Sequence, residues 1–429
     1  MSQRIIEKTS MRLWSISGGR NEFEQYRTLL DGSLKHTLTA EALNEALVPK
    51  AAAAVLGHRH VLAVHDASPI RKPNSRKTEA LGTVRALDNS SVPGYETFNT
   101  ILVSLEDKRI NLLQSTPFSN GSADFRSAAV VKEEQQQRRG LPSEDLADMP
   151  AIEGASTETI IRAHLRVAHT TVQAANPDAV LTHILDRGHD DNGLFAFIDQ
   201  ELGDKFVVRL KSSRNSGITA VNAEGKSVSQ KILAMPMKHR VVQHYAKIRL
   251  GKRVVQDARL VIEYDTVVIE QHTYNVVRVQ YFDRHNKALF KTDMLLLTNH
   301  IVQTDQAAKF IYRLYGQRAR VEEVFHFLKT VLGWEEIQVR DWQSIQTLIT
   351  LCFFIGGYFY EIESALTKNL NVQQICHLGG GKGKHSRTFF LRGLSTLFFA
   401  ASVTTYFREN NISPEQQKQM FEFANAYKP

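Results

Sequence analysis

The sequence predicts an α/β protein in which a mixed β-sheet is flanked by helices, and the pattern of its apolar segments carries this prediction. Two short apolar runs, residues 59–66 and 179–186, each end in an aspartate and are typical of buried strands. Residues 95–105 and 109–114 are further strands, joined by the short polar connection 106–108, which indicates a hairpin. Helical periodicity at residues 157–174, between these strands and the second apolar run, completes the mixed α/β pattern.

The stretch from residue 211 to residue 300 contains several strand-like segments, with Gly, Asp or Asn between some of them. The segments are residues 241–247, 254–264, 266–270, 274–281 and 288–297. We therefore expect an all-β insert that interrupts the α/β core. A helix should follow it, with Thr304 or Asp305 as the N-cap, because both side chains accept hydrogen bonds from backbone N–H groups.

Both ends of the chain have helical periodicity. The predicted helices are residues 21–34, 39–56, 343–366, 388–407 and 414–427. Two interpretations of residues 1–56 stay open: a small DNA-binding arm, or a packing cap on the domain that follows.

The composition is that of a globular protein large enough for two or three domains. The chain has 429 residues, of which 42% are hydrophobic and 23% charged. Lys and Arg exceed Asp and Glu by 53 − 45, which gives a formal net charge of +8. This surplus suits a polyanionic partner such as nucleic acid, although charge alone does not identify one.

Cysteine usage argues against a disulfide framework and against a cysteine zinc site, because Cys352 and Cys376 form no CxxC pair. A reducing cytosol is therefore expected. The N-terminal residues have no apolar signal core. The most apolar run, residues 345–362, is interrupted by polar residues and glycines, which favours a buried helix over a membrane span.

Four chemically versatile side chains share one stripe of a predicted helix. At about 100° per residue, Tyr315, Arg318, Glu322 and Lys329 fall within a narrow sector. A solvated face of an amphipathic helix explains such a stripe equally well. The helical pattern alone therefore leaves the choice between surface and site open.

Three carboxylates form a second pattern, since Asp66 and Asp186 each end a predicted strand and Glu322 lies on the predicted helix. Residues at the carboxyl ends of adjacent strands converge in space. Carboxylate oxygens are the ligands that Mg²⁺ and Mn²⁺ prefer, and two such ions can drive phosphodiester transfer. For any single aspartate, ordinary turn chemistry after a strand explains the pattern as well.

The spacing Tyr315-x2-Arg318-x3-Glu322-x6-Lys329 resembles the Tyr-Arg-Glu-Lys signature of the DDE transposases of bacterial insertion sequences, in particular the hairpin-type cut-and-paste group. Further matching pieces lie between residues 60 and 345. They are Asp66 within Val-His-Asp-Ala-Ser, Leu81-Gly82, Gly94-Tyr95, Asp186-Arg187-Gly188 and Phe206-Val-Val-Arg209.

This resemblance implies an RNase H-like catalytic domain in which Asp66, Asp186 and Glu322 are the catalytic residues and bind two ions of Mg²⁺ or Mn²⁺. It implies that the substrate is double-stranded DNA with terminal inverted repeats, which a homodimer joins to target DNA. It also implies that the protein acts in the bacterial cytoplasm and that no membrane takes part. The expected DNA-binding residues are Tyr315, Arg318, Lys329, Arg187 and Arg209, of which Arg187 and Arg209 are the weaker candidates.

The chain departs from the resemblance in the predicted insert. A relative uses a tryptophan there to hold a flipped base, whereas the tryptophans of this chain are Trp14, Trp334 and Trp342. An aromatic residue of the insert would have to replace it. The candidates are Tyr245, Tyr264, Tyr274, Tyr281 and Phe282. His65, Asp190 and Asp191 flank the acids, and we interpret them as local structural residues.

The resulting organisation has five parts. They are a helical N-terminal region (1–56), the first part of the catalytic core (57–210), the β-rich insert (211–300), the second part of the core with the signature helix (301–342) and a helical C-terminal region (343–429). Two other functions stay open: a non-catalytic DNA-binding regulator derived from a transposase, and a metal-dependent nuclease without strand transfer.

Overall fold

The computed structural model divides into two compact units, residues 40–325 (the core unit) and residues 1–39 with 326–429 (the terminal unit). The boundary between them falls within a helix, α10 (Ala319–Thr330). The structure describes residues 5, 11–12, 17, 19–30, 38–86, 88–127, 130–131, 133, 155–221, 227–250, 253–362, 366 and 368–426.

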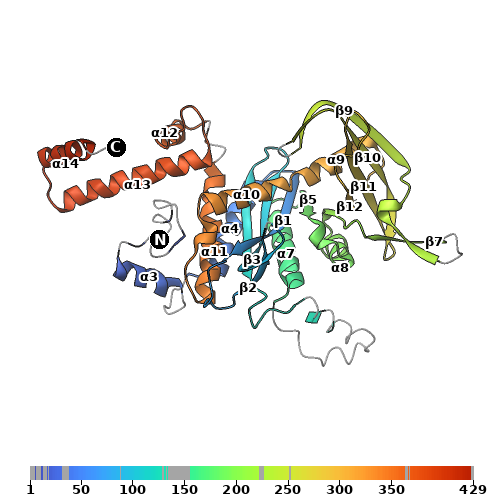
Figure 1. The fold of residues 1–429 in the computed structure, drawn as a ribbon, viewed down its shortest axis with the longest axis horizontal. Helices are drawn as coiled ribbons and strands as arrows, with labels where there is room; N and C mark the ends of the chain where they lie inside the picture. The colour runs from blue at the N-terminus through green and yellow to red at the C-terminus, as the bar shows by residue number, and fades with distance from the viewer. Residues whose placement is uncertain are drawn as a thin grey trace. The chain divides into compact units, whose positions relative to one another are not determined.

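A ten-stranded sheet runs through the core unit (Figure 1). Its strands are β1 (His60–Arg71), β2 (Gly82–Arg85), β3 (Ser91–Ser104), β4 (Ile110–Phe118), β5 (Val180–Leu185), β6 (Lys205–Arg209), β9 (His239–Leu250), β10 (Arg253–Ile269), β11 (His272–Phe282) and β12 (Met294–Thr298). Their order is β2-β3-β1-β5-β6-β12-β11-β10-β9, and β4 pairs with β3. A separate hairpin joins β7 (Asn215–Val221) to β8 (Ser227–Lys231).

The central strands have mixed directions. β1 pairs in parallel with β5, and β5 with β6, whereas β3 is antiparallel to both β1 and β4. Helix α7 (Thr157–Ala175) precedes β5, and its N-terminus is closed by a capping box in which Ser156 and Thr159 bond to each other's backbone N–H groups. This mixed sheet flanked by helices agrees with the mixed α/β architecture that the sequence predicts.

The strands between β6 and α9 (Asp305–Gly316) continue the central sheet. β12 pairs antiparallel with β6, with Leu297 opposite Val208, and β11, β10 and β9 follow in turn. The independent all-β insert expected from the sequence is therefore not confirmed. The two segments predicted at 254–264 and 266–270 form one long strand, β10, because Asp265 stays within the ladder opposite Val276.

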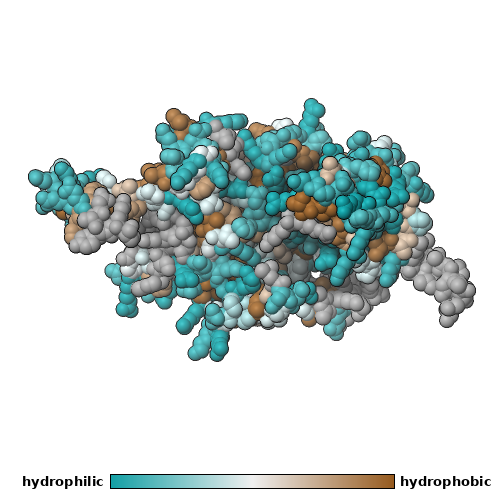
Figure 2. Space-filling view, turned by 45° about the horizontal axis from the view of Figure 1, so that its top comes forward, coloured by the Kyte–Doolittle hydropathy of each residue, from teal (hydrophilic) through white to brown (hydrophobic). Residues whose placement is uncertain are grey.

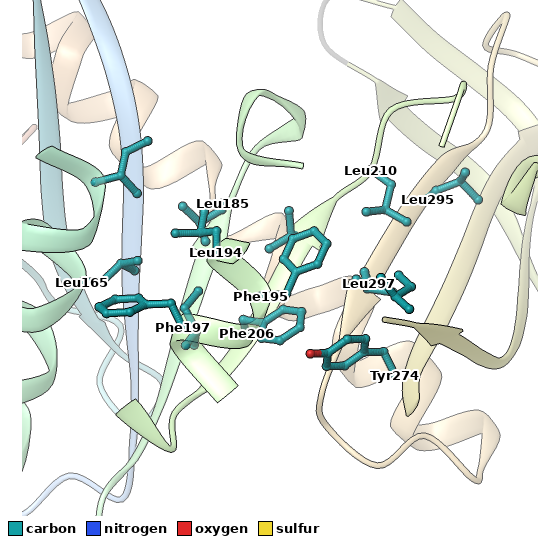
Figure 3. Close-up of a cluster of buried hydrophobic side chains, with 14 of the residues drawn as sticks. Leu165, Leu185, Leu194, Phe195, Phe197, Phe206, Leu210, Tyr274, Leu295 and Leu297 are labelled. Atoms are coloured by element: carbon teal, nitrogen blue, oxygen red, sulfur yellow. The ribbon is translucent and has the colours of Figure 1, made fainter. Parts of the chain in front are cut away.

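Aromatic packing joins the two halves of this sheet (Figure 3). Phe195 and Phe206 stack with centroids 5.5 Å apart, and Tyr274 of β11 meets Phe206 edge-on at 5.5 Å. Leu297 of β12 belongs to the same buried cluster. Because β6, β11 and β12 share this core, the added strands are held by apolar burial as well as by backbone pairing.

Helix α4 (Ala40–Val55) packs on the core unit. Ala51 and Val55 are buried in a cluster with residues of β1 and α7. Asn44 exchanges two hydrogen bonds of 2.9 Å with the backbone of Ser115 in β4. For the second predicted helix, these contacts favour the packing-cap interpretation.

The terminal unit is helical. Its elements are α3 (Arg20–Leu30), η4 (Trp334–Glu336), α11 (Trp342–Glu361), α12 (Leu370–Leu378), α13 (Arg387–Glu409), α14 (Pro414–Ala426) and the end of α10. Trp334 is fully buried, and its Nε1 donates to the carbonyl of Ile349 at 3.0 Å. Trp14 and the predicted continuation of α3 to residue 34 lie outside the described residues.

Hydrophilic residues predominate on the face drawn in Figure 2. Within the described part of the chain, no helix is both long and apolar enough to cross a membrane.

Candidate active site

The register between β1 and β5 places Asp66 beside Asp186. The last parallel pair joins Val64 to Ile184, so each aspartate lies two residues beyond it on its own strand. β1 does not end at Asp66 as the sequence predicted. It continues to Arg71, because its antiparallel pairing with β3 persists, with Asp66 opposite Asn99, after the pairing with β5 stops.

The signature residues span two helices rather than one. α9 ends at Gly316 and α10 begins at Ala319, with a tight turn at residues 317–318. Backbone bonds there run three residues back, from Arg318 to Tyr315 and from Val321 to Arg318. The prediction that the four signature side chains form one stripe at a constant 100° per residue is therefore wrong, because this turn changes the rotation per residue. Thr304 supplies the predicted N-cap of α9, accepting from Ala307 N at 3.2 Å.

Arg318 connects two of the three predicted acids. Its Nη2 donates to Asp66 Oδ2 at 2.9 Å, and its Nη1 donates to Glu322 Oε1 at 2.5 Å. Its Nε is buried and has no acceptor among the described residues. Arg318 is thus an internal counter-cation whose hydrogen-bonding capacity is not exhausted.

The two aspartates have different pKa values. Burial, together with the nearby charge of Asp186, raises the pKa of Asp66 to about 6, although Arg318 acts in the opposite direction. Burial also acts to raise the pKa of Asp186, but hydrogen bonds and charge interactions with His189, the Gly188 N–H and Arg318 lower it to about 2. Two coupled carboxylates with different pKa values are typical of functional sites.

Tyr315 and Arg209 lie at the same site. Tyr315 is buried, and burial raises the pKa of its hydroxyl while the charges of Arg318 and Arg209 lower it. Arg209 also hydrogen-bonds to that hydroxyl, and Asp186 is close enough to interact with it electrostatically. The structure therefore gathers Asp66, Asp186, Glu322, Arg318, Tyr315 and Arg209.

The other two predicted DNA-binding residues have different surroundings. Lys329 lies near the end of α10, and its Nζ pairs with Glu335 at 3.4 Å within the terminal unit. Arg187 is exposed in the short turn that follows Asp186. Among the described residues, no ion pair joins Arg187 to Asp66, Asp186 or Glu322.

Residues that flank the acids have local roles, as expected. Asp191 caps α8 (Asn192–Ala196) by accepting from Leu194 N at 3.0 Å, and Asp190 pairs with Arg214 at 3.2 Å. His65 is buried and bonds to Thr100 and His183. The aromatic candidates Tyr264, Tyr274 and Tyr281 are buried in the sheet.

The sequence reasoning missed His189. Its Nδ1 lies 2.8 Å from Asp186 Oδ1, and the ring is buried. The signal was a histidine three residues after an aspartate at a strand end, which is the spacing of one helical turn.

The donor chemistry of this site fits a hard divalent cation, because carboxylate oxygens converge and Asp66 and Asp186 repel each other. In the described part of the chain, no three His, Cys, Asp or Glu side chains already have the spacing of a metal site. Arg318 donates to the carboxylates of both Asp66 and Glu322.

Residues 162–355 match the family model of the transposase DDE domain. The match includes Asp186, Arg318 and Glu322 and begins after Asp66. The matched segment covers less than half of the chain, and it is similar to the DDE domain of transposases. No curated protein matches the chain.

Proposed function

We propose that this protein is a DDE transposase of the Tyr-Arg-Glu-Lys group, which cleaves terminal inverted repeats and joins the 3′-hydroxyl ends to target DNA. One observation carries the proposal: the β1–β5 register sets Asp66 beside Asp186, and Arg318 links Asp66 to Glu322. The contact between Asp66 and Arg318, which are 252 positions apart in the chain, supports a common site.

Asp66, Asp186 and Glu322 would hold two ions of Mg²⁺ or Mn²⁺. Bound at this site, the ions would activate a water or 3′-hydroxyl and stabilise the leaving oxygen. Ionised carboxylates are required for this, and the low pKa of Asp186 supports that state at neutral pH.

Arg318 would exchange its carboxylate partners for DNA. Its planar guanidinium suits bidentate contact with a phosphate, and its buried Nε lacks an acceptor that a phosphate oxygen would supply. When a DNA end enters, Arg318 would turn towards the backbone and leave Asp66 and Glu322 free. Arg318 thus stabilises the acidic cluster before DNA binds and positions the scissile strand afterwards.

Tyr315 and Arg209 would assist at the same phosphate, because they already lie beside Arg318. Lys329 and Arg187 are proposed to contact the DNA backbone farther along the duplex. A homodimer holding two ends would bring both 3′-hydroxyls to one target.

The test is cleavage of a duplex bearing the element's terminal repeat, with Mg²⁺ present. We expect the wild-type protein to cleave, and the variants Asp66→Asn, Asp186→Asn and Glu322→Gln each to lose at least about 10³-fold in rate, since the ligand set acts as a unit. Glu323→Gln is the matched control, because Glu323 is the neighbouring carboxylate on α10 and pairs instead with Arg320.

A second assay with a precut end measures strand transfer. Cleavage without joining would identify a nuclease, and DNA binding without nicking in Mg²⁺ or Mn²⁺ would identify a regulator. Undiminished cleavage by any of the three acid variants would overturn the proposed site.

A further inference from the structure

The two oxygens of the Asp186 carboxylate have different surroundings. Oδ1 accepts a hydrogen bond of 2.8 Å from Gly188 N and lies 2.8 Å from His189 Nδ1. An ionised carboxylate only accepts hydrogen bonds, so Nδ1 of His189 carries the proton and donates it. Among the described residues, Oδ2 of Asp186 has no donor, which leaves that oxygen available.

The turn that follows β5 is built for this contact. Asp186 caps the short 3₁₀ turn Arg187–His189, which brings both donors back to its own side chain. Gly188 permits the approach, because a Cβ at that position would lie only 3.0 Å from Asp186 Oδ1. A larger residue would therefore push the carboxylate away from its present position.

His189 is held by packing rather than by the hydrogen bond alone. Its side chain is 9% exposed, and its ring lies 5.5 Å from the ring of Phe98 on β3. Phe98 is itself buried and packs edge-on against His164 of α7 at 4.9 Å. The donor is thus anchored to two further elements of the core unit, as a preorganised site requires.

We propose that His189 is a positioning residue that fixes Asp186 Oδ1 and thereby presents Oδ2 to a divalent cation shared with Asp66. The inference rests on the proposed function and deepens it. Hydrogen bonds to the outer atoms of metal-binding side chains orient those side chains, and their loss typically weakens metal affinity by about 10- to 100-fold. Both of the contacts on Asp186 Oδ1 come from its own turn, whereas Asp66 and Glu322 share Arg318.

The test compares two amide variants that differ in where the donor lies. Asn places its amide nitrogen near the position of His Nδ1, whereas Gln places it near Nε2. We expect His189→Asn to bind Mn²⁺ within about threefold of wild type, and His189→Gln and His189→Leu to bind it about 10- to 100-fold more weakly. The measurement is isothermal titration calorimetry of the full chain with Mn²⁺ and without DNA.

Thermal unfolding of each variant shows whether a loss of affinity reflects loss of the fold. If His189→Leu does not fold, the Asn and Gln pair still decides the question. Equal Mn²⁺ affinity of the Asn and Gln variants, or wild-type affinity of the Leu variant, overturns the inference.

Asp186→Asn separates this inference from the proposed function. If wild type binds Mn²⁺, Asp186→Asn does not, and the His189 variants bind normally, only the positioning role fails. If wild type does not bind Mn²⁺, or Asp186→Asn binds it normally, the inference fails, and the cleavage assay of the three acid variants decides the proposed function independently.

Discussion

Mild acid should destabilise the core unit through a buried chain of histidines. Hydrogen bonds of 2.8–3.0 Å connect its members across the sheet. In order they are Thr116, His164, Thr100, His65, His183, Asp204 and His169. The perturbation is a change from pH 7 to pH 5.

The magnitude follows from His164. Burial lowers the pKa of its ring from 6.5 to about 3, whereas in the unfolded chain it titrates near 6.5. Below pH 6.5 the unfolded state therefore takes up a proton that the folded state does not, and stability falls as pH falls towards 3. At about 1.36 kcal/mol per pH unit, the 1.5 units between 6.5 and 5 cost about 2 kcal/mol.

His65 should add to this loss, because burial, together with the neighbouring histidines His183, His164 and His189, lowers the pKa of its ring as well. The loss from His164 alone, about 2 kcal/mol, is a substantial part of a typical stability of about 5–15 kcal/mol.

The assay is urea unfolding of the full chain at both pH values, followed by far-ultraviolet circular dichroism, with the variant His164→Gln. Gln does not titrate, so the variant should lose about 2 kcal/mol less than wild type between pH 7 and pH 5. His285→Gln, at an exposed position, should lose as much as wild type. An equal loss in His164→Gln and wild type would refute the reasoning.

Three further predictions concern the acidic centre and the core. Arg318→Gln should raise Mn²⁺ affinity without DNA by about tenfold, because a competing ion pair worth on the order of 1.4 kcal/mol is removed. Calorimetry measures the Mn²⁺ affinity, and Arg320→Gln is the control variant. Unchanged or weaker Mn²⁺ binding by Arg318→Gln would argue against the counter-cation role of Arg318. Gly188→Ala should weaken Mn²⁺ binding, because its Cβ would crowd Asp186 Oδ1, whereas Gly193→Ala, crowded to a similar degree away from the acids, should not. Calorimetric curves that superimpose for the two alanine variants would contradict this. Phe206→Ala should cost about 3–5 kcal/mol in urea unfolding, because it leaves a cavity among buried aromatic rings. A loss below about 1 kcal/mol would mean that the cluster in Figure 3 does not join the two halves of the sheet.

The local elements of this protein could be predicted from its sequence. The apolar runs before Asp66 and Asp186 form strands, and residues 157–174 form α7 almost as expected. Thr304 caps α9 as proposed. These features depend on side-chain periodicity and on cap chemistry, which act over a few residues and are therefore legible in the sequence.

The pairing of strands that are distant in the chain could not be predicted from local sequence patterns. The sequence does not state that Val64 lies opposite Ile184, which is the register that sets the two aspartates side by side. It also does not show that β12 pairs with β6, which makes the expected insert part of the central sheet. Strand partners are chosen by burial and backbone hydrogen bonds between distant segments, and the period of one strand is compatible with many partners.

The sequence by itself predicted Asp66, Asp186 and Glu322 as the acids of the site, and it placed Glu322 within a Tyr-Arg-Glu-Lys spacing. Only the tertiary structure decided their partners: Arg318 between two of the acids and His189 on the third. The physical reason is that a side chain's charge state and orientation depend on neighbours brought together by the fold, and residue type and spacing do not specify those neighbours.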